Sequence, residues 1–240
     1  MNAGEMLSAA VGLLWRGDCI CCGRMVSRET GVLAAGSAVG PQLCQDCGWE
    51  LQGSWTRVSP PVSVVPVYAA GSYGGVHRAL ILAMKEHLRP AALKIGARVV
   101  ESGMLQLAAA GVVGDPRWTT VVLLPAPSRR KAARARGGDL VSRLCALVAH
   151  RWQRVHAIDV AYLEDSARDS VGLGRAERRA NIAAHIHLEH RALQRVRELR
   201  DATVVVIDDV CTTGATSAQF TLALRAAGIA PSAVLVLGAA

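Results

Sequence analysis

The sequence predicts an α/β protein whose open, mainly parallel sheet is flanked by helices and preceded by a small N-terminal metal-binding module. Residues 119–127 and 202–210 contain continuous runs of Val, Leu and Ile, and segments with helical spacing alternate with such runs. Runs of this kind indicate strands that are covered on both faces, as in a parallel sheet. Two C-x2-C pairs near the N-terminus predict the module.

The 240 residues suffice for one medium-sized domain and a small appendage. Residues 1–58 form the expected module, with an apolar helix over 6–17 that packs on the main body and the cysteine pairs after it. Consecutive prolines, Pro60 and Pro61, stop regular structure and mark the expected boundary. Residues 59–240 form the second expected domain.

Strands and helices are expected to alternate along this second domain. Apolar residues at helical spacing predict helices over 76–87, 90–111, 139–152 and 216–228. Extended segments or buried strands are predicted over 62–73, 119–127, 202–210 and 233–238. Residues 157–200 are polar, charged and weakly periodic, which favours a mobile hairpin or an excursion over the active face rather than a core element.

Composition and charge narrow the classes of protein and partner. A hydrophobic fraction of 51% and a charged fraction of 19% indicate a globular chain, and no apolar run reaches the roughly 18 residues that span a bilayer. The net charge of +8 indicates an anionic partner, either a phosphorylated small molecule or nucleic acid. Basic residues gather in 129–136 and 175–181 without interleaved aromatic residues, which weakens a base-stacking role.

The cysteine spacing predicts a structural zinc site. Each C-x2-C turn directs two thiolates at one point, and two such turns complete a tetrahedron; the four ligands are Cys19, Cys22, Cys44 and Cys47. Cys21 could replace a neighbour, but the spacing favours it as a spectator, and a redox cluster is the alternative interpretation. Residues 6–17 do not have the pattern of a signal peptide, so a reducing, cytoplasmic location is expected.

Two adjacent aspartates, Asp208 and Asp209, end the predicted strand over 202–210. Ligands of open parallel sheets bind beyond the carboxyl ends of the strands, so both carboxylates should face such a ligand. The next segment runs into a helix whose N-terminus offers unpaired N–H groups; its residues are Cys211, Thr212, Thr213, Gly214, Ala215 and Thr216. A ribose 5-phosphate fits this arrangement, with its phosphate in the loop and its ring hydroxyls on the aspartates.

Other phosphate-binding motifs are absent from the sequence. There is no G-x-x-x-x-G-K-[ST] loop and no G-x-G-x-x-G fingerprint after a strand. The plain alternative is a strand, a turn and a threonine-capped helix with two exposed aspartates. A pair of aspartates followed by T-T-G-x-T makes that alternative the weaker interpretation.

The segment "VVVIDDVCTTGAT" resembles the phosphoribosyl pyrophosphate (PRPP) motif of type I phosphoribosyltransferases. Joined to an N-terminal four-cysteine element, it is similar to the ComF family of competence proteins. The segment "LILAMK" resembles the family's L-I-x-x-L-K and supplies Lys85, and "LLPAPSRRKAARARG" resembles its V-P-x-P strand end with the following R-x-R-G, through Pro125, Arg134 and Arg136. The chain departs from the family at Asp139 and at Ser170, where Asn and Gln are common.

The resemblance implies a type I phosphoribosyltransferase-like fold and Mg²⁺-dependent PRPP binding. Asp208 and Asp209 would hold the 2- and 3-hydroxyls, residues 211–216 the 5-phosphate, and residues 165–181 would form a lid. The leaving pyrophosphate would meet the turn after Pro125, with residues 129–136, and among them Arg129, Arg134 and Arg136, as its neutralising cations. Displacement at C1 would be promoted mainly by charge placement.

Three functions are compatible with the sequence. The first is transfer of a phosphoribosyl group to an unidentified base or amine, with pyrophosphate release. The second is a regulatory PRPP-binding protein without turnover. The third is a DNA-handling protein that contacts single-stranded DNA or other competence-machinery proteins, as the resemblance and the charge suggest.

Overall fold

A six-stranded sheet forms the centre of the protein in the computed structural model, which describes residues 17–26, 31–32, 43–87, 89–128, 138–164 and 185–240. Its strands, in spatial order, are β5 (Thr56–Val58), β6 (Val67–Ala69), β12 (Ala233–Ala239), β11 (Thr203–Cys211), β7 (Val121–Pro125) and β8 (Val155–Ala157). Neighbouring strands are parallel except at the β5–β6 edge, which is antiparallel. The predicted α/β class with a mostly parallel sheet is therefore confirmed.

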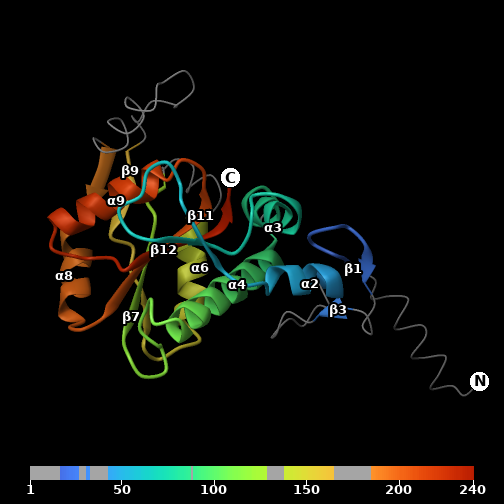
Figure 1. Cartoon of the computed structure of the whole chain (residues 1–240), viewed down its shortest axis with the longest axis horizontal. Helices are drawn as coiled ribbons and strands as arrows, with labels where there is room; N and C mark the ends of the chain where they lie inside the picture. Colours follow the sequence, from blue (N-terminus) through green and yellow to red (C-terminus); the bar gives the residue numbers. More distant parts are fainter. Residues whose placement is uncertain (1–16, 27–30, 33–42, 88, 129–137, 165–184) are drawn as a thin grey trace, which may run out of the picture.

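Helices cover both faces of the sheet (Figure 1). One face packs against α3 (Gly75–Lys85), α4 (Pro90–Ala109) and α6 (Leu140–Ala149), and the other packs against α8 (His190–Glu198) and α9 (Ala215–Ala226). Side chains alternate along β11, so that Val205 and Ile207 join the first cluster while Val204 and Val206 join the second. Among the described helices, none combines the length and the apolar character needed to cross a membrane.

The helices expected over 76–87, 90–111, 139–152 and 216–228 correspond to α3, α4, α6 and α9. The segment 157–200 contains a short antiparallel hairpin, β9 (Ala161–Leu163) with β10 (Ile186–Leu188), and then α8. The helix α8 was not expected. Only Leu193 and Val196 are buried among its charged residues, which leaves a narrow apolar stripe. The expected lid, residues 165–181, lies outside the described residues.

The N-terminal module consists of two small antiparallel ribbons and one short helix. The ribbons pair β1 (Gly17–Asp18) with β2 (Met25–Val26) and β3 (Gly31–Val32) with β4 (Leu43–Cys44), and α2 (Gln45–Leu51) follows directly. The helix expected over 6–17 lies outside the described residues, apart from Gly17.

The module shares the hydrophobic core of the larger domain. Val26, Leu43 and Leu51 belong to the same buried cluster as Leu80 and Met84 of α3. The chain then enters the central sheet at β5, before the prolines that mark the expected boundary. The division at residue 58 stays a prediction, but the module is not packed as a separate body.

Candidate functional site at the carboxyl edge of the sheet

Asp208 and Asp209 lie where β11 extends beyond its neighbour β7. Ile207 is the last residue of β11 in register with β7, opposite Pro125, whereas pairing with β12 continues to Cys211. The aspartates therefore lie within β11 rather than at its end. One side of the strand is open at this point, which leaves both carboxylates only half-buried.

Lys85, at the last turn of α3, forms an ion pair with the second aspartate. Its Nζ lies 2.5 Å from Asp209 Oδ2, and the two side chains are 29% and 15% exposed. The helix approaches the sheet edge from one face and delivers the ammonium group directly to the carboxylate. Lys85 and Asp209, which the sequence predicted separately as site residues, are thus brought together.

Asp208 has a strongly perturbed carboxyl group. Burial, followed by the negative charge of Asp209, raises the pKa of Asp208 to about 8, against a usual value of 3.8. The Asp209 N–H donates to Asp208 Oδ1 over 2.8 Å, and the Lys85 charge also opposes the shift. A carboxyl group beside a like charge is harder to ionise, and carboxyl groups perturbed in this way are common at functional sites.

The loop after β11 turns sharply into α9. Gly214 has φ +74°, a left-handed conformation that favours glycine, and α9 begins at the next residue, Ala215. The first turn of α9 therefore presents N–H groups without intrahelical acceptors to the same edge as the aspartates. Thr212 is exposed, while Thr213 and Thr216 are half-buried.

The segment around Pro60 packs against this loop. Val62 N donates to Thr213 O over 3.0 Å, and a Cβ on Gly214 would lie 2.1 Å from Val62 O. The same Cβ would also meet the Pro60 ring at 3.0 Å. The sequence marked these prolines only as a boundary. This contact joins segments that lie far apart in the sequence, so local patterns do not reveal it.

A shallow cavity of about 250 Å³ opens beside the end of β7. It is lined by Pro125, Ala126, Ser128, Asp139, Ser142, Asp159, Ala161, Tyr162 and Glu189. Asp139 caps α6 by accepting from Ser142 N over 2.8 Å, and Ser128 Oγ donates to the other Asp139 oxygen. This residue stands where the family resemblance expects Asn, and its role here is to order the start of α6. Arg129, Arg134 and Arg136 lie outside the described residues.

The four predicted zinc ligands converge in the module. The Sγ atoms of Cys19, Cys22, Cys44 and Cys47 all lie within 4.8 Å of one another, and the Cys22 and Cys44 sulfurs are 3.6 Å apart. In a tetrahedral site with zinc–sulfur bonds of about 2.3 Å, the sulfurs lie ~3.8 Å apart. The donor set and its spacing are compatible with a structural zinc ion.

Cys21 lies outside this cluster, as its spacing predicted. Burial, followed by the charges of Cys19, Cys22 and Cys44, raises the pKa of the Cys21 thiol to about 12. Because its sulfur is not among the four that converge, Cys21 is a neighbour of the site and does not complete it.

Models of known protein families do not match this chain, and a search of curated proteins finds no match either. The resemblance to the ComF family therefore depends on the motif residues themselves.

Proposed function

We propose that this protein binds PRPP at the carboxyl edge of the sheet and transfers its phosphoribosyl group to an acceptor, with release of pyrophosphate. The observation that carries this proposal is the adjacency of the Asp208–Asp209 pair to the loop at Gly214 and the first turn of α9. A ribose phosphate needs both parts: oxygen acceptors for its ring hydroxyls and N–H donors for its phosphate. The type I phosphoribosyltransferase-like fold and the ComF-type relationship belong to the same proposal.

The loop and helix are suited to the 5-phosphate. The left-handed Gly214 lets the chain turn sharply into α9 against the Val62 segment, and the α9 dipole favours an anion at this end. Thr212, Thr213 and Thr216 add hydroxyl donors from residues that are exposed or half-buried. Cys211 and Ala215 are buried and contribute through their backbone.

The carboxylate pair is suited to the ribose ring and to Mg²⁺. Carboxylate oxygens are the ligands that Mg²⁺ uses when it is bound together with substrate phosphates, where it neutralises charge on the leaving pyrophosphate. The two aspartates would hold that ion, directly or through the ribose hydroxyls. The high pKa of Asp208 fits such a site, because a divalent cation replaces the proton that Asp208 otherwise retains.

Residues beside the pair would act on the leaving group. Lys85 would move from Asp209 to a ligand oxygen as the metal and sugar enter, and the turn after Pro125 would face the pyrophosphate. The aspartates would stabilise the positive charge that develops at C1. Catalysis would then come mainly from positioning and charge placement.

Titration calorimetry with PRPP and Mg²⁺ tests the binding step. The wild-type protein should bind, and a double D208N/D209N variant should lose at least about a hundredfold in affinity, because both hydroxyl acceptors lose their charge. A matched control is D46N, which removes a carboxylate that is 70% exposed in the N-terminal module. Equal affinity of the double variant and the wild type would remove the site assignment.

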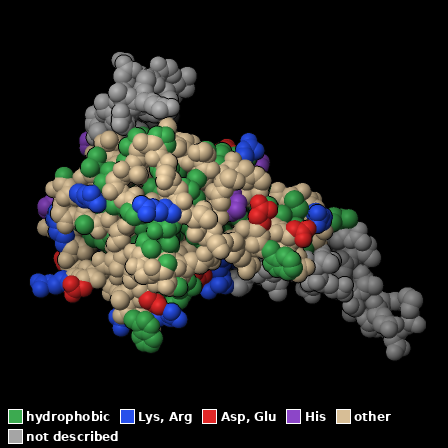
Figure 2. Space-filling view, viewed as in Figure 1, with side chains coloured by type: hydrophobic (Ala, Val, Ile, Leu, Met, Phe, Trp, Pro, Cys, Tyr) green, Lys and Arg blue, Asp and Glu red, His purple; other side chains and the backbone are tan. Residues whose placement is uncertain are grey.

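A pyrophosphate-release assay against a panel of bases, amines and single-stranded DNA separates transfer from sensing. Release with one acceptor class supports the transferase. Binding of PRPP without release for any acceptor supports the non-catalytic regulator. On the face in Figure 2, the described Lys and Arg side chains lie in separate groups rather than in one continuous basic track, so this face does not favour the DNA-handling alternative.

We also propose that the cysteine cluster holds zinc as a structural ion. Four thiolates close a tetrahedral shell and leave no open position for chemistry. The cluster is therefore assigned to stability and positioning, and the reaction to the edge of the sheet.

A further inference from the structure

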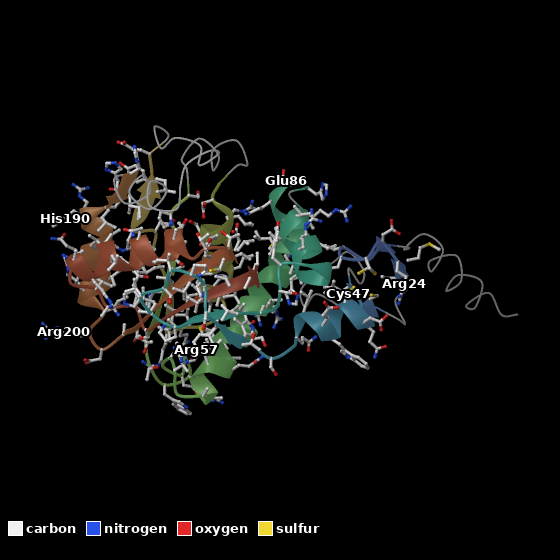
Figure 3. All side chains as sticks on the ribbon, turned by 45° about the horizontal axis from the view of Figure 1, so that its top comes forward. Arg24, Cys47, Arg57, Glu86, His190 and Arg200 are labelled. Atoms are coloured by element: carbon white, nitrogen blue, oxygen red, sulfur yellow. The ribbon has the colours of Figure 1, made fainter. Side chains whose placement is uncertain are left out.

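The cysteine cluster and the aspartate pair are connected by two helices in contact. Cys44 is the residue before α2 and Cys47 lies within it, so two of the four ligands lie at the first turn of that helix. The helix α2 packs on α3, and Figure 1 shows α3 between the module and the edge of the sheet. Figure 3 shows Cys47 on α2 at one end of this connection and Glu86 at the far end of α3.

Glu50 of α2 reaches the N-terminus of α3. Its Oε1 lies 3.5 Å from the position that a Cβ on Gly75 would occupy. No side-chain cap serves this helix end within the described residues, where Gly74 occupies the cap position. A carboxylate beside the positive end of a helix dipole is favourable, so Glu50 stabilises the start of α3 from the neighbouring module.

His77, in the first turn of α3, also lies close to Glu50. The side chain is 6% exposed, and burial lowers its pKa while the charge of Glu50 raises it. Its ring packs flat on Gly71, where a Cβ would lie 2.3 Å from the ring. The first turn of α3 is thus held between the module and the strand end that precedes it.

The opposite end of α3 carries Lys85, which pairs with Asp209. The helix has 11 residues, so about 15 Å of rigid backbone separate the Glu50 contact from the ion pair. Its buried residues Leu80, Ile81 and Met84 belong to the same core cluster as Leu51 of α2. Because α3 is one continuous helix, a shift of its start against α2 moves the lysine at its other end.

We propose that Glu50 is a positioning residue through which a metal ion at the cysteine cluster sets the position of Lys85 beside Asp209. Four thiolates this close together repel one another unless a cation holds them, and α2 starts at that cluster. A bound metal ion would hold the first turn of α2 in place, and Glu50 of α2 would then hold the start of α3. The position of α3 in turn sets the position of Lys85. The inference rests on the proposed zinc site, and only its PRPP readout rests on the proposed phosphoribosyl transfer.

The first test compares zinc-loaded with chelator-stripped full-length protein by hydrogen exchange. Stripping should increase exchange in α3 at least about fivefold and leave α9, on the other face of the sheet, unchanged. The Lys85 side chain supplies a spectroscopic readout, because the chain's lysines are Lys85, Lys94 and Lys131. After reductive ¹³C-methylation, the Lys85 resonance should move toward that of a free lysine when zinc is removed.

The second test keeps the metal and removes the contact. The E50Q variant should retain the zinc content of the wild type, yet show the same direction of change in α3 exchange and in the Lys85 resonance. The D46N variant is the matched control: it makes the same charge change on α2, but Asp46 is 70% exposed and pairs with Arg24, away from α3. If removal of zinc unfolds the chain, the comparison of zinc-loaded E50Q with zinc-loaded D46N decides the proposal.

Equal behaviour of E50Q and D46N would overturn the coupling. By reciprocity, Mg²⁺–PRPP should raise zinc affinity in a chelator competition by the same factor by which zinc raises PRPP affinity. If PRPP fails to bind the zinc-loaded protein, the proposed function is wrong, while the exchange and lysine measurements still decide the role of Glu50.

Discussion

Lys85 Nζ lies 2.5 Å from Asp209 Oδ2, which joins the last turn of α3 to the strand that carries both aspartates. Both side chains are partly buried, so the pair is neither a freely solvated surface bridge nor a fully desolvated one. The positive charge of Lys85 also lowers the pKa of Asp208, although burial and the charge of Asp209 raise this pKa by more. Lys85 is thus a determinant of the charge state of the whole site.

Replacing Lys85 by methionine should weaken Mg²⁺–PRPP binding about tenfold and displace its pH dependence toward higher pH. The variant removes the cation that opposes protonation of Asp208, so the carboxyl group is available for metal only at higher pH. Calorimetry over a pH series measures both effects. K94M, the same change at an exposed position of α4, should leave them as in the wild type.

The titration of Asp208 predicts a pH dependence of stability. In the folded protein Asp208 retains its proton up to about pH 8, whereas in the unfolded chain it ionises near 3.8. The folded state binds more protons over this interval, so the contribution of Asp208 lowers the free energy of unfolding as the pH rises through it. In thermal melts, D208N should therefore gain stability over the wild type progressively between about pH 4 and about pH 8. A constant difference would contradict the assignment.

Alanine at Gly214 should destabilise the protein more than alanine at Gly228. Both glycines have left-handed backbones, with φ of +74° and +77°, so both substitutions carry a strain of about 1–2 kcal/mol. Only at Gly214 would the new Cβ meet Val62 O, at 2.1 Å, whereas it has open space at Gly228. Denaturant unfolding should show the excess, and equal losses would mean that the loop moves freely away from the proline segment.

Metal analysis should find about one zinc ion per chain, and C47S should lose it. The predicted consequence is a lower melting temperature, because metal binding to such a site contributes folding free energy and Leu51 of α2 packs into the shared core. C21S is the matched control and should retain zinc, since Cys21 lies outside the cluster. Loss of zinc in C21S alone would reassign the ligands.

Local patterns predicted the regular elements well. The continuous apolar runs of β7, β11 and β12 and the 3.6-residue periodicity of α3, α4, α6 and α9 need no distant partner to be recognised. The cysteine set could also be predicted, because C-x2-C spacing directs thiolates within one turn. The strand β5 and the helix α8 were missed, since a three-residue edge strand and a two-residue apolar stripe carry too little periodic signal.

The sequence by itself determined which residues are chemically competent: two adjacent carboxylates before a glycine-containing loop, and four thiols in two pairs. Only the tertiary structure decided what these groups touch. In the folded chain Lys85 pairs with Asp209, Val62 donates a hydrogen bond to Thr213, and Glu50 lies at the start of α3. These contacts depend on a strand order that no local segment of the sequence encodes. The reason is physical: spacing along the chain sets local geometry, whereas contacts between distant segments depend on how the whole core packs.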